Sequence, residues 1–297
     1  MSSTTVRVAE QLRGICMADS SKKDFVEALA RGLEVIRTFD RIHVKQTISQ
    51  ISERTLLARP TVLRLLLTLE DLGYVRSQDN FYSLTPKVVD LGMAYVSSLG
   101  LYGAAKPHME NLCKEVDQTI SLAELDGSDI VYTGRVEVPK IVSVGVTVGA
   151  RLPSASTALG RVLLAAVPDP ELHEVLSTPS LSMYIPRTRY TVEQIRPRLQ
   201  AAREQGWAES DEDLQYGVQA IAAPLRGEDG RVIAAIGLGT HTSEIGKEIV
   251  RERYLPLLLE TAQLVEKDWE HCRKLPTSEF ALALDGLQLL HLRRTNA

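Results

Sequence analysis

The stretch "LLARPTVLRLLLTLEDLGYV" (residues 56–75) interrupts a run of leucines with arginine and threonine at regular intervals. Pro60 suits the first turn of a helix, where its missing N–H has no helical partner to lose. Gly73 is a favoured residue just beyond a helix end. The stretch therefore predicts a helix from about Pro60 to Leu72, with both ends marked by their own residues.

The two faces of this predicted helix differ in chemistry. At about 100° per residue, Thr61, Arg64 and Thr68 share one sector of roughly 60°. The opposite side carries the apolar residues Val62, Leu65, Leu66 and Leu69. On an isolated helix such a polar face usually does no more than meet solvent, so the neighbouring sequence decides whether it has a function.

The neighbouring sequence predicts a winged helix-turn-helix. The segment "TISQISER" opens with Thr47 and has Gln50 three residues later, a capping-box pattern for a helix start. A four-residue interruption, "TLLA", separates this helix from the one that begins at Pro60. A polar turn at 77–80, between apolar residues, indicates a short β-hairpin after it. This order of elements favours DNA binding over a merely solvated face.

In such a fold the second helix enters the major groove. Arginine there can bind a guanine edge or a phosphate, and threonine can contact a phosphate or a thymine methyl. The hairpin reaches adjacent phosphates or the minor groove. We therefore expect DNA contacts from Thr47, Arg59, Thr61, Arg64 and Thr68 of the helices and from Arg76, Gln78 and Asn80 of the wing.

The turn between the two helices has an unusual sequence. Such turns often hold glycine, whereas Leu56 and Leu57 occupy this one. A leucine that adopts a left-handed conformation costs roughly 1–2 kcal/mol. We therefore expect either strain at this turn or a turn of another construction.

The charge of the chain is distributed unevenly. The net charge is -4 over 297 residues, which does not suggest a nucleic-acid binder. Residues 1–90, however, carry 13 Lys and Arg against 11 Asp and Glu, and the remainder carries 21 against 27. Three arginines and no acid lie between Arg54 and Arg64. A local basic patch matters more for DNA binding than the total charge.

Periodicity divides the chain into segments of different character. We expect a flexible leader at 1–22, the winged helix-turn-helix at 23–85, a linker helix at 86–106, an α+β domain at 107–272 and a tail at 273–297. The helical pattern of the winged helix-turn-helix starts at Phe25. In the tail, "FALALDGLQLLHL" has the pattern of one more helix. In the α+β domain the patterns predict strands at 119–125, 129–138, 220–226 and 231–240, and helices from Pro107, at 156–167, at 191–204 and at 243–269.

The sequence excludes several classes of protein. The six histidines form no HxH or HExxH pattern, GxSxG is absent, and "SVGVTVGA" lacks the GK[ST] of a phosphate-binding loop. The three cysteines include no CxxC, no signal peptide opens the chain, and no apolar run approaches the ~20 residues of a membrane span. We expect a cytoplasmic protein that is no enzyme and uses no metal, cofactor or membrane. A DNA-binding protein without a ligand is a further alternative, which the size of the C-terminal part disfavours.

Longer motifs resemble those of one family, the IclR-type transcriptional regulators. The helix quoted above with its "LGYV" is similar to the family's DNA-binding domain, and "VGARLPSASTALGRVLLA" resembles its effector-domain signature. The segment "GWAESDEDLQYGVQAIAAPLRGEDGRVIAAI" resembles a second signature. "DGSDIVYTGRV" and "FDRIHVKQTISQISERT" look like the branch that regulates protocatechuate and p-hydroxybenzoate catabolism in the β-ketoadipate pathway. The resemblance spans about residues 25–270.

The resemblance implies a winged helix-turn-helix joined by a linker helix to a GAF-like α+β effector-binding domain. It further implies a homodimer or dimer of dimers that binds operator DNA and responds to a small organic acid, either aromatic or non-aromatic. The chain departs from the family pattern where a histidine and an alanine are common, at Ala155 and Ser156, and where arginine is frequent, at Gln219. These departures put the identity of the acid in doubt.

Residues for the effector site follow from helix chemistry and from the resemblance. Ser154, Ser156 and Thr157 open an apolar helix, whose N-terminus favours a carboxylate, although each hydroxyl alone is as well explained as a helix cap. Asp211 opposes a carboxylate but can accept a phenolic hydroxyl. The expected effector-binding set is Ile141, Ser154, Ser156, Thr157, Ala158, Ser210, Asp211, Gln219 and Ile221. Ile141 is equally well explained as a core residue of the sheet.

Overall fold

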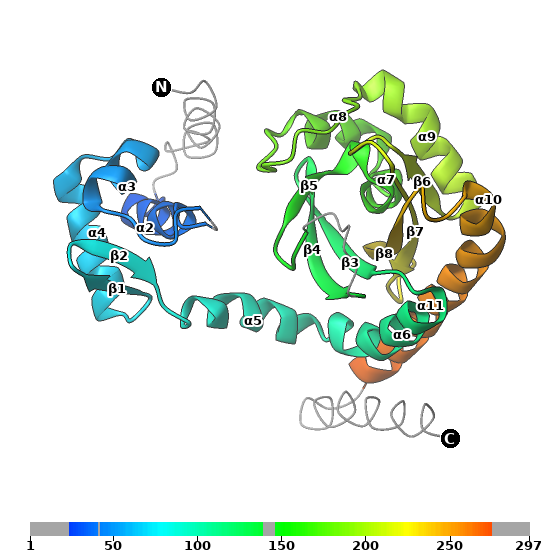
Figure 1. Ribbon diagram of the computed structural model, residues 1–297, viewed down its shortest axis with the longest axis horizontal. Helices are drawn as coiled ribbons and strands as arrows, with labels where there is room; N and C mark the ends of the chain where they lie inside the picture. Colours follow the sequence, from blue (N-terminus) through cyan, green and yellow to red (C-terminus); the bar gives the residue numbers. More distant parts are fainter. Residues whose placement is uncertain (1–23, 41, 139–145, 275–297) are drawn as a thin grey trace. The chain divides into compact units, whose positions relative to one another are not determined.

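The structure of the protein is a computed structural model that describes residues 24–40, 42–138 and 146–274. The chain divides into two compact units, Met1–Tyr95 and Val96–Ala297 (Figure 1). The leader expected at 1–22, the helix expected in the tail and Ile141 lie outside the described residues.

The N-terminal unit has the predicted winged helix-turn-helix. Its elements are α2 (Glu27–Arg37), α3 (Ile48–Thr55), α4 (Arg59–Asp71) and the antiparallel hairpin of β1 (Val75–Gln78) and β2 (Phe81–Leu84). Pro60 lies in the first turn of α4, and Gly73 follows its end with a φ of 78°, as the sequence predicts. Gln46 forms a bridge to Tyr82 and thereby ties the start of α3 to the wing.

The core of this unit is small and lies between the three helices and the hairpin. The buried residues are Val35, Ile51, Val62, Leu66, Leu69, Val75 and Tyr82. The apolar repeat of Phe25, Leu29 and Leu33 predicts a helix there, but all three side chains are exposed. The apolar periodicity correctly predicts a helix, but the face of α2 that packs on α4 is the one that carries Val35.

The two tight turns of the unit contain left-handed residues. Leu56 has a φ of 57°, so the strained alternative considered for this turn is the one that the chain adopts. The Ser52 hydroxyl donates to the Leu57 carbonyl oxygen at 2.6 Å and supports the turn from α3. In the wing, Asp79 and Asn80 both have positive φ, which is the geometry of a two-residue type I′ hairpin. The hairpin turn is therefore shorter than the 77–80 segment expected.

The C-terminal unit contains one six-stranded antiparallel sheet. The strand order is β5 (Arg151–Pro153), β4 (Asp129–Val136), β3 (Ile120–Asp126), β8 (Val232–His241), β7 (Val218–Arg226) and β6 (Ala208–Asp211). A register shift in the β3–β4 pairing, between Leu122 and Ala123, leaves Thr133 of β4 without a partner residue, which is a β-bulge. The α+β class expected from the sequence is confirmed.

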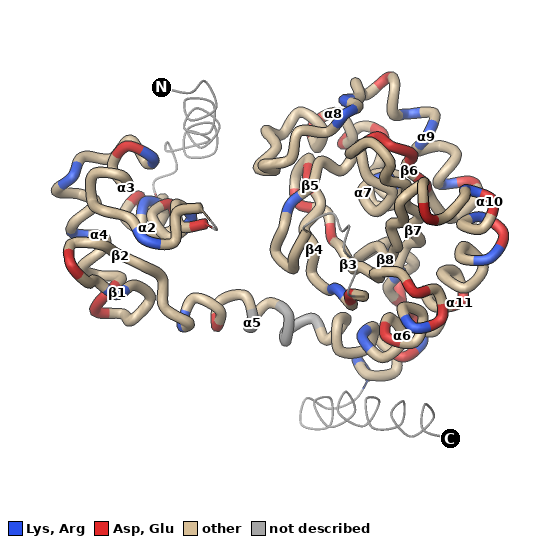
Figure 2. The backbone as a smooth tube through the Cα atoms, in the orientation of Figure 1, with Lys and Arg blue, Asp and Glu red and all other residues tan. Residues whose placement is uncertain are grey.

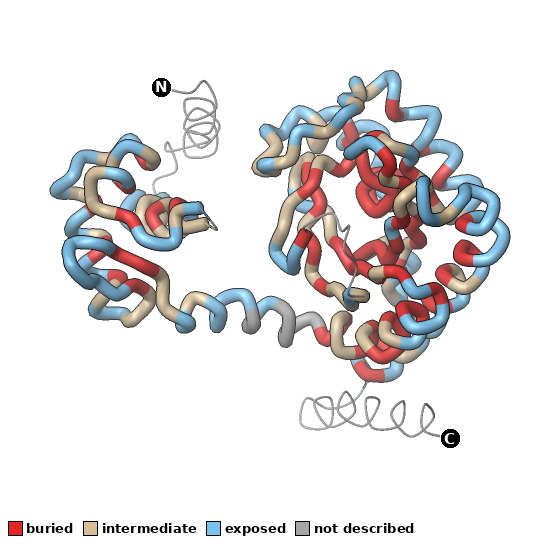
Figure 3. The backbone as a smooth tube through the Cα atoms, viewed as in Figure 1, coloured by how far each residue is buried: buried red, intermediate tan, exposed pale blue. Residues whose placement is uncertain are grey.

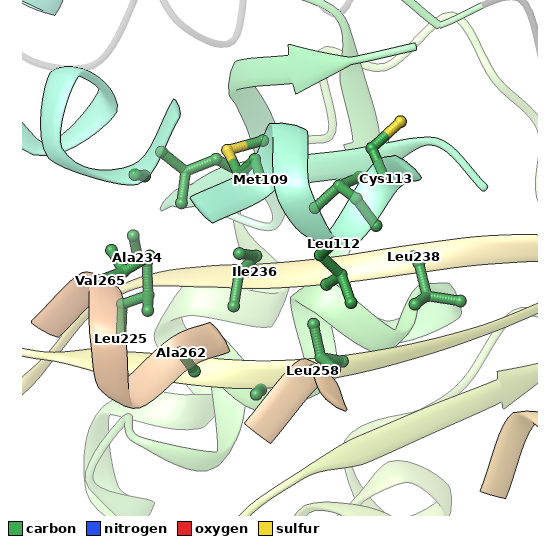
Figure 4. Close-up of a cluster of buried hydrophobic side chains, with 14 of the residues drawn as sticks. Met109, Leu112, Cys113, Leu225, Ala234, Ile236, Leu238, Leu258, Ala262 and Val265 are labelled. Carbon is green, nitrogen blue, oxygen red and sulfur yellow. The ribbon is translucent and has the colours of Figure 1, made fainter. Parts of the chain in front are cut away.

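Helices cover both faces of this sheet. On one face, α6 (Leu101–Val116) and α11 (Leu255–Arg273) pack with Leu225, Ile236 and Leu238 in the larger core (Figure 4). On the other face lie α7 (Ala158–Ala165) and, packed against it, α9 (Val192–Gln205), with α8 (Asp169–Ser177) beside α9. Figure 3 shows burial concentrated in the strands and in α7. Charged residues lie mainly on the outer helices (Figure 2).

Two helices differ from the sequence-based expectations. The helix expected to begin at Pro107 begins at Leu101, after α5 (Val88–Leu99) and Gly100, which has a φ of 62°. The helix expected at 243–269 is one continuous helical run at 247–273, made of α10 (Lys247–Ile249), a π-helical turn (Val250–Tyr254) and α11. Pro256 explains the π turn, because a proline cannot donate to the preceding turn and the wider turn takes up the mismatch. No described helix is long and apolar enough to cross a membrane.

A buried ion pair fixes the loops on the α7 side of the sheet. Arg161 of α7 donates to the Asp213 carboxylate at 2.7 Å and to the Glu209 carbonyl oxygen at 2.6 Å. The Tyr190 hydroxyl donates to the other oxygen of Asp213. Burial opposes the ionisation of Asp213, but Tyr190 and Arg161 outweigh it and lower the pKa of this carboxyl.

Replacing Leu56 with glycine should stabilise the N-terminal unit. Glycine tolerates a positive φ, so Leu56→Gly should raise the free energy of unfolding by up to about 1 kcal/mol. Leu57→Gly is the matched control and should lower it, because Leu57 is partly buried against the small core. Denaturant unfolding of both variants measures this, and a destabilised Leu56→Gly protein would contradict the strain assigned to the turn.

Asp213→Asn should destabilise the C-terminal unit by about 3–5 kcal/mol at pH 7, because it leaves Arg161 buried without a counter-charge. A carboxyl whose pKa is lowered by folding stabilises the fold above its unfolded pKa of about 3.9 and loses this effect as the pH falls through its folded pKa. The difference between wild type and variant should therefore shrink below about pH 4. Denaturant titrations across this range test it. Asp169→Asn, at an exposed ion pair, is the control and should leave the stability nearly unchanged.

Candidate functional site

The polar face of α4 is free to meet another molecule. Arg59, Arg64 and Thr68 are exposed and Thr61 is half-buried. Within the described parts of the chain, the guanidinium groups of Arg59 and Arg64 have no hydrogen bond or ion pair. The Thr68 hydroxyl donates to the Arg64 carbonyl oxygen at 3.0 Å, so its hydrogen is not free for a phosphate.

The wing is fastened to α4 by Glu70. Its carboxylate accepts from the Ser77 N–H at 3.0 Å and from the Ser77 hydroxyl at 2.6 Å. Arg76, Gln78 and Asn80 are exposed on the hairpin beyond this attachment. The position of the wing relative to α4 is therefore fixed by these hydrogen bonds.

One residue expected to contact DNA, Thr47, and one residue of the basic window, Arg54, have partners within the protein. The Thr47 hydroxyl is part of the predicted capping box, in which it accepts from the Gln50 N–H at 3.4 Å. Arg54, which opens the basic window of the sequence, donates to Asp40 at 3.1 Å. Sequence reasoning missed Leu63 and Leu67, which are 36% and 48% exposed on α4. Their exposure could not be read from the leucine run itself.

A cavity of about 150 Å³ lies between the sheet and the N-terminal end of α7. A cavity of roughly this volume accommodates a benzene ring. The sheet is open there because the strands carry Ala220, Gly237 and Gly239. A Cβ on Gly239 would meet its nearest atoms only at 3.7 Å or more, so the residue borders free space.

Five of the residues expected at the effector site line this cavity: Ser156, Thr157, Ala158, Ser210 and Ile221. Thr157 is the N-cap of α7 and accepts from the Gly160 N–H at 3.1 Å. The Ser156 hydroxyl donates to the Thr188 carbonyl oxygen at 2.8 Å. Ile221 borders the cavity, but its side chain belongs to the core on the other face of the sheet, so we assign the cavity-facing side chain to its neighbour Ala220.

Three expected residues do not line the cavity: Ser154, Asp211 and Gln219. Ser154 is fully buried and its hydroxyl donates to the Ser128 carbonyl oxygen at 2.7 Å. Asp211 pairs with Lys247 at 2.5 Å on the surface. Gln219 points to the opposite face of the sheet, where it donates to the Ile245 carbonyl oxygen at 2.6 Å. These three expected effector-site residues therefore lie outside the lining of this cavity.

Sequence reasoning missed the most distinctive polar residues of the cavity, Tyr132 and Arg135 of β4. Residues three apart on a regular strand point to opposite faces. The bulge at Thr133 adds a residue between them, so both reach the α7 face. The arginine in the apolar segment "DIVYTGRVEV" was a readable signal, whereas the bulge was not.

The two side chains have different electrostatic properties. Burial raises the pKa of Tyr132 to about 12, so its hydroxyl stays neutral at pH 7. That hydroxyl has no hydrogen-bond partner among the described residues. The Arg135 guanidinium is 11% exposed, and it donates to Glu137 at 2.5 Å and to the Ser121 hydroxyl at 3.3 Å. The described residues contain no cluster of three or more His, Cys, Asp or Glu placed to hold a metal ion.

Comparisons with known proteins agree with this architecture. The model for the IclR helix-turn-helix domain matches residues 28–79, and the model for the C-terminal region of bacterial IclR transcriptional regulators matches residues 93–267. The chain is 40% identical to the Pca regulon regulatory protein of Pseudomonas putida, over 80% of this chain and 81% of that protein. It is 31% identical to the Pca operon regulatory protein of Acinetobacter baylyi, over 81% of this chain and 88% of the relative.

A solved structure shares both the fold and part of the sequence. An IclR homologue from Microbacterium hydrocarbonoxydans, complexed with 4-hydroxybenzoate, matches with a TM-score of 0.70 and 29% identity, over 82% of this chain and 99% of that one. The relatives support the resemblance to the branch of Pca regulators. Because the matched regions fall in both compact units, the chain belongs to the IclR family of bacterial transcriptional regulators.

Proposed function

We propose that this regulator binds an aromatic carboxylic acid in the cavity beside α7 and thereby controls genes for the breakdown of such acids. The observation that carries the proposal is a cavity of ring size whose apolar walls include Val146, Leu152 and Leu159 and whose polar residues include a cation. A non-aromatic acid is the alternative. The apolar walls favour a ring, because burying one contributes more hydrophobic free energy than burying a short chain.

The relatives support the same assignment. Two of them are named as regulators of Pca genes, and a homologue has been solved with 4-hydroxybenzoate bound. We propose that Ser156, Thr157, Ala158 and Ser210 contact the acid, with Ile221 behind them. For DNA we propose contacts from Arg59, Thr61, Arg64 and Thr68 and from the wing residues Arg76, Gln78 and Asn80, with Thr47 positioning α3.

A ligand in the C-terminal unit can change DNA binding only if it favours one conformation over another. We propose a dimer or dimer of dimers that places two α4 helices in major grooves about 34 Å apart along the duplex. Calorimetry with protocatechuate, p-hydroxybenzoate and β-ketoadipate tests the ligand class. Binding of at least one of the two aromatic acids supports the proposal, and binding of an unrelated acid alone contradicts it.

Filling the cavity should abolish ligand binding. Gly239→Leu places a branched side chain in the ring-sized space, so the affinity for p-hydroxybenzoate should fall below the detection limit of calorimetry while the protein stays folded. Gly239→Ala, which adds one methyl group where 3.7 Å is free, is the control and should retain binding. Equal affinity of the Leu variant and wild type would place the ligand elsewhere.

Arg64→Ala should weaken operator binding by roughly 1–3 kcal/mol if the guanidinium contacts a base. The affinity should still fall with salt, because other phosphate contacts remain. Arg31→Ala, which removes the same charge from α2 where Arg31 pairs with Glu27, should bind like wild type. Fluorescence anisotropy with an operator duplex measures both variants, and an unchanged affinity of folded Arg64→Ala protein contradicts the role of α4.

A further inference from the structure

We propose that Arg135 binds the carboxylate of the effector and that Glu137 occupies Arg135 until the effector displaces it. This inference rests on the proposed function, because it assumes that an aromatic acid enters the cavity. It differs from the expectation drawn from the sequence, in which the N-terminus of α7 receives the carboxylate.

Arg135 has hydrogen-bond donors that no described residue uses. A guanidinium has five N–H donors. Nε donates to Glu137 at 2.5 Å and Nη1 to the Ser121 hydroxyl at 3.3 Å. The remaining three N–H groups have no acceptor within the described residues. Among the described residues Nη2 has no acceptor and Nε is held by Glu137, so the Nε–Nη2 edge can receive a carboxylate through two hydrogen bonds once Glu137 leaves.

Arg135 attracts an anion more strongly than the other positive site of the cavity, the N-terminus of α7. A helix end contributes about half an elementary charge, and the Ser156 hydroxyl and the Gly160 N–H are already used in the cap region. Arg135 carries a full charge and is the only Lys or Arg among the described residues that line the cavity. Charge-assisted hydrogen bonds are about twice as strong as neutral ones. The guanidinium should therefore dominate the placement of the carboxylate.

Glu137 has the same functional group as the proposed ligand, a carboxylate. It follows Arg135 by two residues, just past the end of β4, and its carboxylate accepts from the Arg135 Nε. Its carboxylate is 58% exposed, whereas the guanidinium is 11% exposed. On release, Glu137 can be hydrated at little cost, as in other exposed ion pairs. Exchange of Glu137 for the ligand keeps one carboxylate on Arg135 throughout.

Tyr132 gives the cavity a second polar group that suits a hydroxylated ring. Tyr132 reaches the same cavity because of the bulge at Thr133. It is 8% exposed, and its hydroxyl has no hydrogen-bond partner among the described residues. As it is neutral at pH 7, it does not repel an anion and can donate to or accept from a second oxygen on the ring. Arg135 and Tyr132 together therefore select an aromatic acid that also carries a hydroxyl group.

The experiment compares p-hydroxybenzoate with p-hydroxybenzamide, its neutral isostere, by calorimetry on the full chain. Wild type should prefer the acid by about 10-fold or more, because hydrogen bonds to a charged group contribute about 1.5–3 kcal/mol. Arg135→Gln should lose that preference through weaker binding of the acid, with the amide little changed. Glu137→Gln should bind the acid more tightly than wild type, because the internal competitor is gone. Arg251→Gln, at an exposed ion pair with Glu209, is the matched control and should behave like wild type.

The outcomes separate the two proposals. If wild type binds neither compound nor protocatechuate, the proposed function fails and this inference fails with it. If wild type binds the acid and Arg135→Gln keeps the same preference for acid over amide, only the role of Arg135 is overturned. Should Arg135→Gln fail to fold, Glu137→Gln decides, since unchanged or weaker binding of the acid by that variant overturns the displacement.

Discussion

A strand places successive side chains on opposite faces of its sheet, and the C-terminal unit depends on this constraint. The face under α6 and α11 carries large apolar side chains such as Ile236 and Leu238 and forms the main core. The face under α7 alternates with it and carries Ala220, Gly237 and Gly239 where the cavity lies. One sheet can thus supply both the stability of the unit and the space for a ligand, because each task uses its own set of alternate residues.

The loops that close the cavity are held by groups that are themselves buried. Arg161 connects α7 to the carbonyl oxygen of Glu209 and to Asp213, while Tyr190 secures the other side of Asp213. Asp213 of this ion pair lies between Ser210, at the end of β6, and Leu214 in the chain, and both of these residues line the cavity. A ligand that enters the cavity therefore meets walls whose positions are set before binding, which reduces the ordering cost of association.

Local signals predicted most elements, and long-range pairing determined the rest. Thr47, Pro60 and Gly73 mark helix ends through their own backbone preferences, so the winged helix-turn-helix was readable from the sequence. The exposed side of α2 could not be predicted, because hydrophobic periodicity does not show which face of a helix another element covers. For the same reason the sequence did not show that Gln219 bonds to the Ile245 carbonyl oxygen away from the cavity. A bulge at Thr133 brought Tyr132 and Arg135 together without any mark in the sequence. Ser156, Thr157, Ala158 and Ser210 could be named beforehand because helix-cap chemistry and family signatures are local.

The central claim is that an acid bound in the C-terminal unit changes how the chain binds DNA. An operator selected from random duplexes can be titrated with the protein at fixed salt, with and without saturating p-hydroxybenzoate. The account predicts that the operator affinity changes by about 5-fold or more, and that the affinity for the acid changes by the same factor when the operator is bound. Calorimetric binding of the acid with no change in operator affinity would contradict it.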